Sequence, residues 1–331
     1  MRVVSYNLWH GLNGSGVWSF GELEPPGRRQ QREEWQIRQL ALLDADLLLL
    51  QEVNPLRSRA PLLGQRLART WVSQVDQGGL RIGTQGVPRN FQNGMMILAH
   101  PNLRLKERGG LRLSGHPFGF CSHWASLQFS EFRYLLAGEI SWKDRRVLVV
   151  NSHLHHGRAL HQRERKEIDE VVQTGSLTPD EAQRLRQAME EARQRRFREV
   201  QRALEWIESQ AGYDGVLWGG DFNCEVSHGE LDALFRAGFE EITSGVGPTW
   251  DSEGNLENHE ITLGMKVPLP DFGKPEVGRM ISRWDLRSEK IDLLFCKGEI
   301  FQGRSKARRI LDKPVGGLIG SDHFGVLCEW S

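Results

Sequence analysis

The sequence predicts an α/β fold built in layers, and two observations support this. Short apolar stretches typical of strands alternate along the chain with longer stretches of helical periodicity. The chain has 331 residues, which exceeds the usual size of one domain, but a sandwich of two large sheets reaches this length as a single unit. We therefore expect one domain that spans residues 1–331.

The first elements are a strand over residues 3–9, a long loop, a helix and a second strand. Residues 10–30 are rich in Gly, Pro and Ser, which is typical of a loop and makes this segment a candidate lip for a substrate site. Apolar residues then recur at Trp35, Ile37, Leu40 and Leu43, which predicts a helix from about Gln30. That helix leads into a leucine-rich strand over residues 46–53.

Four further strands are predicted at residues 93–99, 124–129, 134–140 and 146–152. Because the last three follow one another closely, we expect them to form an antiparallel meander. Beyond residue 210 the pattern predicts a strand over 216–219 and a short helix over 230–237. Residues 263–285 contain several Pro and Gly together with Trp284, which favours an extra loop.

A helical hairpin is predicted over about residues 158–210, which are dominated by Arg, Glu and Gln. Thr178 fits an N-cap, with Pro179 at the first helical position and Glu181 completing a capping box. The second helix extends to about Ser209, and we expect its inner face to carry the side chains of Phe197, Val200, Leu204 and Ile207. The alternating charges favour a solvated face over a nucleic-acid contact, although one basic residue between 193 and 198 remains a candidate for reaching the site.

Composition narrows the classes of function. Lys plus Arg equals Asp plus Glu, 43 each, so the formal net charge is +0 and a protein built for nonspecific duplex binding is not indicated. The four cysteines (Cys121, Cys224, Cys296 and Cys328) form no CxxC pair, which favours buried reduced thiols over disulfides. With no signal peptide or membrane-span pattern visible, we expect a cytoplasmic protein, or a secreted one if a leader was removed.

Residues able to bind a metal or a phosphate follow several of the predicted strands. They are Asn7, Glu52, His153, Asp221 with Asn223, and Asp322 with His323. Because alternate residues of a strand share a face, Asp221 and Asn223 should point the same way while Phe222 packs behind them. Each motif alone also fits a surface turn or a helix cap.

The imidazoles of His153, His155 and His156 raise the alternative of a zinc site. Residues at i and i+2 of a strand supply two ligands, and neither a cysteine nor a second cluster supplies the others at the usual spacing. Zinc is therefore the weaker interpretation. Trp250, in the segment Gly247–Asp251, fits either a core aromatic or a side chain that stacks on a substrate.

In their order along the chain, these motifs resemble the endonuclease/exonuclease/phosphatase superfamily of DNase-I-like metal-dependent phosphohydrolases. The resemblance rests on Asn7, Gln51-Glu52, His153, Gly220-Asp221-Phe222-Asn223, Lys290-Ile291-Asp292-Leu293-Leu294-Phe295 and Ser321-Asp322-His323. It implies a four-layered α/β sandwich of two mainly antiparallel sheets flanked by helices. The hairpin at about 158–210 would be an insertion into that fold.

The resemblance also implies in-line attack of water on phosphorus, assisted by Mg²⁺ or Mn²⁺, which prefer oxygen ligands. Asn7, Glu52 and Asp322 would bind the metal, and Asp221 or His323 would act as the base. Asn223 would fix a phosphate oxygen or the water, His153 and His323 would flank the phosphate, and Asp292 would orient His323. The sequence leaves open which residue is the base and whether one or two metals bind.

One position departs from part of the superfamily. Some DNA-repair members carry an acid two residues after the first-strand Asn, where this chain has Trp9. We therefore expect a phosphodiesterase, in preference to a phosphomonoesterase, acting on nucleic acid, a lipid headgroup or a small phosphodiester. A nuclease of the same superfamily and an inactive binding or scaffold member are the alternatives, and the intact set of polar residues argues against the latter.

Overall fold

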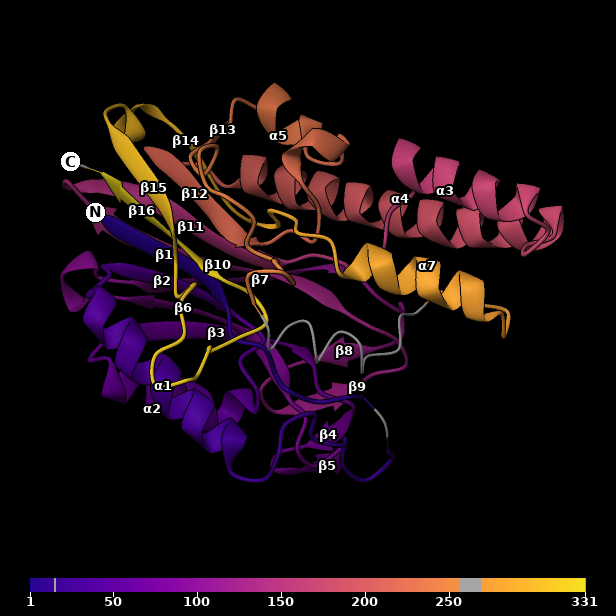
Figure 1. Ribbon diagram of the computed structural model, residues 1–331. Helices are drawn as coiled ribbons and strands as arrows, with labels where there is room; N and C mark the ends of the chain where they lie inside the picture. The colour runs from indigo at the N-terminus through magenta and orange to yellow at the C-terminus, as the bar shows by residue number, and fades with distance from the viewer. Residues whose placement is uncertain (15, 256–268, 331) are drawn as a thin grey trace.

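In the computed structural model, which describes residues 1–14, 16–255 and 269–330, two six-stranded sheets pack face to face (Figure 1). The first sheet has the order β15 (Ser305–Ile310), β16 (Gly325–Trp330), β1 (Arg2–Asn7), β2 (Leu47–Gln51), β6 (Asn93–Ala99) and β3 (Thr70–Gln77). The second has the order β13 (Glu240–Glu241), β14 (Asp292–Lys297), β12 (Gly215–Asp221), β11 (Arg145–His153), β10 (Arg133–Trp142) and β7 (Lys106–Ser114).

Most neighbouring strands are antiparallel, but each sheet has one parallel pair near its centre. β1 pairs with β2 so that Asn7 lies opposite Gln51, and β11 pairs with β12 so that His153 lies opposite Asp221. The carboxyl ends of parallel strands meet at the same edge. Each sheet thus delivers two of its polar strand ends to one place.

The apolar core lies between the two sheets. Side chains such as Leu49, Ile97, Val149 and Leu217 are fully buried there. Each fully buried aliphatic side chain contributes roughly 1.5–3 kcal/mol relative to an exposed one. All of β2 is buried, which explains why its sequence is a continuous leucine run with no alternation.

Helices cover the outer faces of the sheets (Figure 1). α1 (Arg28–Leu43) and α2 (Leu56–Arg66) lie against the first sheet, and α4 (Pro179–Ser209) and α5 (Asp232–Arg236) against the second. Short 3₁₀ turns occur at η1 (Pro101–Leu103), η2 (Val226–His228) and η3 (Glu299–Phe301). The predicted layered sandwich is confirmed. None of the helices within the described ranges is long and apolar enough to cross a membrane.

The predicted hairpin is formed by α3 (Gln162–Gln173) and α4, and the capping box at Thr178 is present. The inner face of α4 differs from the prediction, because Phe197 is 37% exposed. Arg196 and Glu199 are buried in its place. At this point α4 packs on a polar loop. The spacing of apolar residues alone therefore placed Phe197 on the inner face of the helix, where Arg196 and Glu199 lie instead.

The prediction of a loop over 263–285 is wrong for its second part. Residues 263–268 lie outside the described residues, and α7 (Pro275–Asp285) is a helix. Pro275 occupies its first turn, and the apolar spacing of Val277, Met280, Ile281 and Trp284 buries one face against α3 and α4. The Gly and Pro content hid this periodicity.

The predicted three-strand meander is also corrected. β10 and β11 pair antiparallel as expected, but the other neighbour of β10 is β7. The strand predicted at 124–129 is β9 (Ala125–Leu127), which belongs to a small third sheet with the order β5 (Gln85–Val87), β4 (Leu80–Ile82), β9 and β8 (Phe120–Cys121). Strand propensity is local, whereas the choice of partner depends on distant segments.

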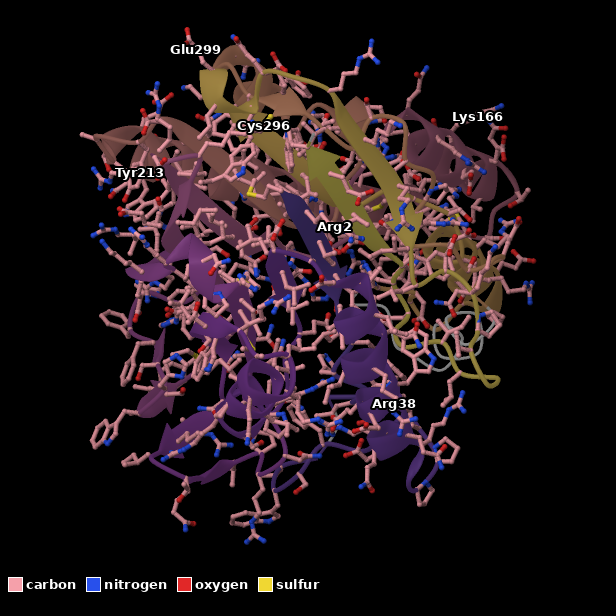
Figure 2. The ribbon with its side chains drawn as sticks, turned by 90° about the vertical axis from the view of Figure 1, so that its left-hand side faces the viewer. Arg2, Arg38, Lys166, Tyr213, Cys296 and Glu299 are labelled. Atoms are coloured by element: carbon pink, nitrogen blue, oxygen red, sulfur yellow. The ribbon has the colours of Figure 1, made fainter. Side chains whose placement is uncertain are left out.

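The chain termini mark the end of the sandwich that lies away from these small strands (Figure 1). Figure 2 views the molecule from that end, with Arg2 of β1 near the middle and Tyr213, Cys296 and Glu299 on the side of the second sheet. Arg2 pairs there with Glu329 at 3.0 Å. All four cysteines are buried and free, as predicted.

Candidate active site

A cavity of about 300 Å³ lies where the carboxyl ends of the parallel strands meet. Both sheets, the loop after β11, the hairpin and the segment around Trp250 contribute to its wall. The predicted residues that line it are Glu52, His153, Asp221, Asn223, Asp322 and His323. Asn7 and Asp292 lie behind this surface and contact it by hydrogen bonds.

Asp221 is the centre of the cluster. Its Oδ2 accepts a hydrogen bond from Asn7 Nδ2 at 3.0 Å, and lies 3.5 Å from His153 Nε2 and 3.7 Å from His323 Nε2. Its Oδ1 accepts from the backbone N–H of Asn223 at 2.9 Å. The structure therefore brings together residues that lie up to 316 positions apart in the numbering from Asn7 to His323.

Glu52 is held at the end of β2 by two donors. The backbone N–H of His10 donates to Oε2 at 3.0 Å, and Asn7 Nδ2 donates to Oε1 at 3.3 Å. Glu52 has a backbone φ of 54°, a left-handed conformation that is uncommon for a residue other than glycine and is often found at functional sites. The backbone strain at Glu52 thus supports a functional role for its carboxylate.

His323 is oriented from behind by Asp292. Its Nδ1 lies 2.8 Å from Asp292 Oδ2, and the backbone N–H of Asp292 donates to Thr249 Oγ1 at 3.0 Å. Trp250 packs edge-on against the His323 ring at a centroid distance of 5.1 Å and donates its indole N–H to the backbone oxygen of Asp285. The ring of His323 is thus fixed on two sides.

Asn223 and Phe222 follow the strand in part as predicted. Phe222 is fully buried between Trp218 and Phe295, as the alternation of side chains indicates. β12 ends at Asp221, however, and Asn223 has a φ of 51° with its amide donating to the backbone oxygen of Leu154. A turn, not the strand, places Asn223 at the cavity.

The orientation of Asn7 differs from the expectation that its amide oxygen faces a metal. Its Oδ1 accepts from the Trp9 backbone N–H at 2.9 Å, while its Nδ2 faces Glu52 and Asp221. Two carboxylates attract the donor end of an amide. Rotation of the amide by 180° would present the oxygen to a cation instead.

Burial shifts the pKa of three groups of the cluster, Asp221, Asp322 and His153, away from the charged form. It raises the pKa of the Asp221 carboxyl to about 6 and that of Asp322 to about 7. Burial also disfavours protonated imidazoles and holds the pKa of His153 well below its usual value. For His323 the carboxylates of Asp292 and Asp221 outweigh burial, so that its pKa lies well above the usual value.

The donor set fits a hard divalent cation. Four acidic side chains, those of Glu52, Asp221, Asp292 and Asp322, converge here, and Asp292 Oδ1 is buried without a hydrogen-bond partner. Ligand atoms of Asp221, Asp292 and His323 lie within 4.8 Å of one another. Oxygen-rich sites of this kind suit Mg²⁺ or Mn²⁺ better than zinc.

A second cluster beside the cavity was not foreseen. Glu131, just before β10, lies 2.6 Å from His155 Nδ1 and 2.9 Å from His156 Nδ1. It supplies the further ligand that the sequence seemed to lack, but the guanidiniums of Arg133 and Arg195 also contact Glu131. Because these cations already neutralise the carboxylate, the cluster is better suited to hold the loop than to bind a metal.

The hairpin supports that same loop. Arg196 is buried, donates to the backbone oxygens of His155 and Gly157, and pairs with Glu230 at 3.2 Å. Glu199 accepts from the backbone N–H of His155 at 2.8 Å. Arg196 also lines the cavity, so one basic residue between 193 and 198 does reach the site.

Sequence reasoning missed His10, Arg133 and Arg158, which also line the cavity. His10 follows Trp9 at the point where the predicted loop begins, and Arg133 precedes a predicted strand. Arginines and histidines at such positions are common in any chain. Only the tertiary structure distinguishes these three.

Comparison with known proteins gives a consistent result. The sequence model of the Endonuclease/Exonuclease/phosphatase family matches residues 4–323, whereas no curated protein matches the chain. Solved structures with the same fold include a humanized TDP2 from D. rerio, with a TM-score of 0.58 and 14% identity over 100% of this chain and 98% of that one. A functionally unknown conserved protein from Enterococcus faecalis has a TM-score of 0.58 and 17% identity over 100% and 99%.

A mannosyl-6-phosphatase from Bacteroides thetaiotaomicron is a further structural neighbour. It has a TM-score of 0.55 and 15% identity over 100% of this chain and 99% of that one. At identities this low, these three structures establish the fold alone.

Proposed function

We propose, from the premise that the chain belongs to the endonuclease/exonuclease/phosphatase family, that it is a divalent-metal-dependent phosphodiesterase. The observation that carries the proposal is the convergence on Asp221. Two imidazoles and an amide surround one buried carboxylate at a cavity formed by both sheets. This arrangement suits attack of water on a phosphorus atom.

Glu52, Asn7 and Asp322 would hold the metal ion, with the Asn7 amide rotated to present its oxygen. A divalent ion at this position supplies charge neutralisation for the phosphoryl oxygens. Glu52 is the best-placed ligand, because the backbone N–H of His10 fixes one of its oxygens, and rotation of the Asn7 amide would free the other, which accepts from Asn7 in the structure.

Asp221 is the base in this proposal. Burial raises its pKa to about 6, close enough to neutrality for the carboxylate to be present at pH 7 and to accept a proton from water. The backbone N–H of Asn223 holds one of its oxygens, which leaves the other directed to the two histidines. Asn223 itself positions the loop on which a phosphate oxygen would rest.

His323 stabilises negative charge on the phosphate and does not act as the base. The contact of its Nδ1 with Asp292 keeps the ring protonated. The other nitrogen, Nε2, which faces Asp221, therefore has a proton to donate and no free electron pair with which to accept one. His153 is neutral and faces the same carboxylate from β11. Together they would flank the phosphoryl group and donate to oxygens on which charge develops.

The charge of the cavity supports a diester over a monoester. Arg158 pairs with Glu289 at its Nη1, and Arg196 pairs with Glu230. These carboxylates neutralise the arginines, so they add little attraction for the second negative charge of a monoester dianion. A phosphodiester carries one negative charge, which suits a cavity whose arginines are already paired with carboxylates.

Hydrolysis of bis-p-nitrophenyl phosphate and p-nitrophenyl phosphate, each with Mg²⁺ or Mn²⁺, tests the proposal. We expect faster turnover of the diester, loss of turnover on addition of EDTA and recovery with excess metal. Glu52→Ala should lower kcat/KM by about 10²–10³, whereas Glu208→Ala, an exposed acid on α4, should not. EDTA-resistant turnover, or faster turnover of the monoester, would overturn the metal dependence or the diester preference respectively.

A further inference from the structure

Large hydrophobic side chains gather on the surface of the small third sheet. Eight of the fourteen exposed large hydrophobic residues of the described ranges belong to this sheet and the segments beside it. We name this set the aromatic face: Val17, Trp18, Leu80, Ile82, Phe118, Phe120, Trp124 and Phe129. Exposure reaches 80% for Phe118 and 72% for Trp124.

The strand register places part of the aromatic face in rows. Leu80 on β4 lies opposite Val87 on β5 and Leu127 on β9, and Leu127 lies opposite Phe120 on β8. Paired residues project to the same side of a sheet, so this row crosses all four strands. Ile82 is two residues from Leu80 and therefore extends the same side.

Loop contacts make the face continuous. The backbone N–H of Gly83 donates to the backbone oxygen of Trp124, and that of Arg89 donates to Trp18. His116 contacts both Phe118 and Phe129 at centroid distances of 5.6 and 5.7 Å. Figure 1 shows the four small strands gathered at one corner of the molecule, away from the chain termini.

The aromatic face adjoins the candidate active site. Gln77 and Glu131 line the cavity, and they lie three residues before Leu80 and two residues after Phe129. On the other side His10, also in the cavity wall, packs edge-on against Phe91. Phe91 in turn contacts Phe20, which follows Trp18 by two residues. A surface that rests on this face is therefore within reach of the cavity.

The charged residues around the aromatic face distinguish between two partners, a single-stranded nucleic acid and a lipid surface. The segments that carry it, residues 16–20, 78–90 and 115–130, contain no acidic residue and only two cations, Arg81 and Arg89, in a chain with 26% charged residues. Arg81 is buried and donates to backbone oxygens of its own loop. A single-stranded nucleic acid requires a cationic groove along its phosphates in addition to aromatic rings, whereas a neutral lipid surface does not.

We propose that the aromatic face docks the protein on a bilayer of zwitterionic phospholipid. Tryptophan and phenylalanine partition into the headgroup region of membranes, and binding there scales with the apolar area that is buried. A second part of the proposal rests on the proposed function: the phosphodiester that enters the cavity is a lipid headgroup presented at that surface.

Co-sedimentation with phosphatidylcholine vesicles tests the docking face. The double variant Phe118→Ser/Trp124→Ser should bind vesicles at least ten-fold more weakly than the wild type, since two highly exposed anchors are lost. Both side chains are exposed, so the fold should persist, as circular dichroism would show. The matched control is Leu42→Ser, an equally exposed apolar residue at the end of α1.

The outcomes separate the alternatives. Failure of the wild type to bind neutral vesicles, or equal binding by the double variant, would overturn the docking face. Loss of single-stranded oligonucleotide binding or of self-association in the double variant, without vesicle binding by the wild type, would assign the face to nucleic acid or to a second copy. Because vesicle binding needs no turnover, His323→Ala should bind vesicles normally, and docking is judged apart from catalysis.

The headgroup assignment has its own test. Hydrolysis of phosphatidylcholine or sphingomyelin in vesicles, with Mg²⁺, should fall at least ten-fold in the double variant while turnover of bis-p-nitrophenyl phosphate stays unchanged. If the wild type cleaves the soluble diester but no vesicle lipid, the headgroup assignment fails and the proposed function stands.

Discussion

The active-site cavity and the aromatic face adjoin each other but depart from ordinary protein surfaces in opposite ways. Three buried acidic side chains, those of Asp221, Asp292 and Asp322, converge with the partly buried Glu52 at the cavity, whereas the aromatic face exposes eight large apolar residues. Burying a charge and exposing a contiguous apolar patch both cost stability. Such departures persist where a ligand compensates for them. We propose a cation with a phosphate as the ligand of the cavity and a lipid surface as the ligand of the aromatic face.

The largest expected effect concerns the cavity. His323→Ala removes the protonated imidazole and should lower kcat for bis-p-nitrophenyl phosphate by about 10³-fold. Trp124→Ser, on the aromatic face, should leave this soluble turnover within two-fold, roughly, of the wild type. Steady-state kinetics of the two variants measure the two changes in kcat. Equal losses in both would show that the two regions do not act separately.

A smaller effect is expected for Asp292, which positions His323 and does not line the cavity. Asp292→Asn should lower kcat by about 10²-fold with little change in KM, because substrate contacts are kept. The double variant Asp292→Asn/His323→Ala should be no slower than His323→Ala alone. Additive losses in this cycle would mean that Asp292 acts independently of the histidine.

The cost of burying a charge can also be measured at a carboxyl group outside the cavity wall, that of Asp76, through the stability of the folded protein. Asp76 is fully buried, neither of its oxygens has a hydrogen-bond partner, and burial raises its pKa to about 7. A raised pKa in the folded state means that stability is lost as pH rises from the unfolded value near 4 to about 7.

Asp76→Asn should therefore raise the free energy of unfolding at pH 8, by up to about 4 kcal/mol, and change it little at pH 4. Urea unfolding at the two pH values measures this. A destabilised variant at pH 8 would show instead that the ionised carboxylate is stabilised by the nearby Arg133.

The smallest expected effect is at Glu139, on β10 and away from both regions. Arg146 donates to it at 2.9 Å and holds its pKa at about 2, against the effect of burial and with help from Arg108. The side chains of Arg108 and Arg146 are 37% and 50% exposed, so solvent screens both ion pairs and Glu139→Gln should cost only about 1 kcal/mol. A depressed pKa gives stability above about pH 4 that is lost as pH falls toward 2. Unfolding at pH 7 and pH 3 should show the difference shrink, and an equal difference at both would exclude the ion pair as its cause.

Much of the candidate site could be predicted from the sequence because its motifs are a few residues long and several of them lie at the end of a strand. Glu52, His153 and Asp221 follow apolar runs whose direction fixes where the polar residue emerges. The layered fold followed from the same runs. The orientation of the Asn7 amide could not be predicted, because it depends on two carboxylates 45 and 214 residues away.

Other features depend on packing that local patterns do not record. Phe197 has the spacing of a core residue, yet α4 turns Arg196 and Glu199 inward because the loop after β11 offers backbone groups to bind. β9 has strand propensity but pairs with β4 and β8. The aromatic face escaped notice because its residues come from three separate segments, and each exposed aromatic alone is unremarkable in a sequence.

The proposed function requires that this cavity catalyse attack of water on phosphorus with Asp221 as the base. Turnover of bis-p-nitrophenyl phosphate in H₂¹⁸O with Mg²⁺, followed by mass spectrometry of both products, tests it most directly. We expect one ¹⁸O atom in p-nitrophenyl phosphate, none in p-nitrophenol, and loss of turnover in Asp221→Asn. Label in p-nitrophenol, or undiminished turnover by Asp221→Asn, would contradict it.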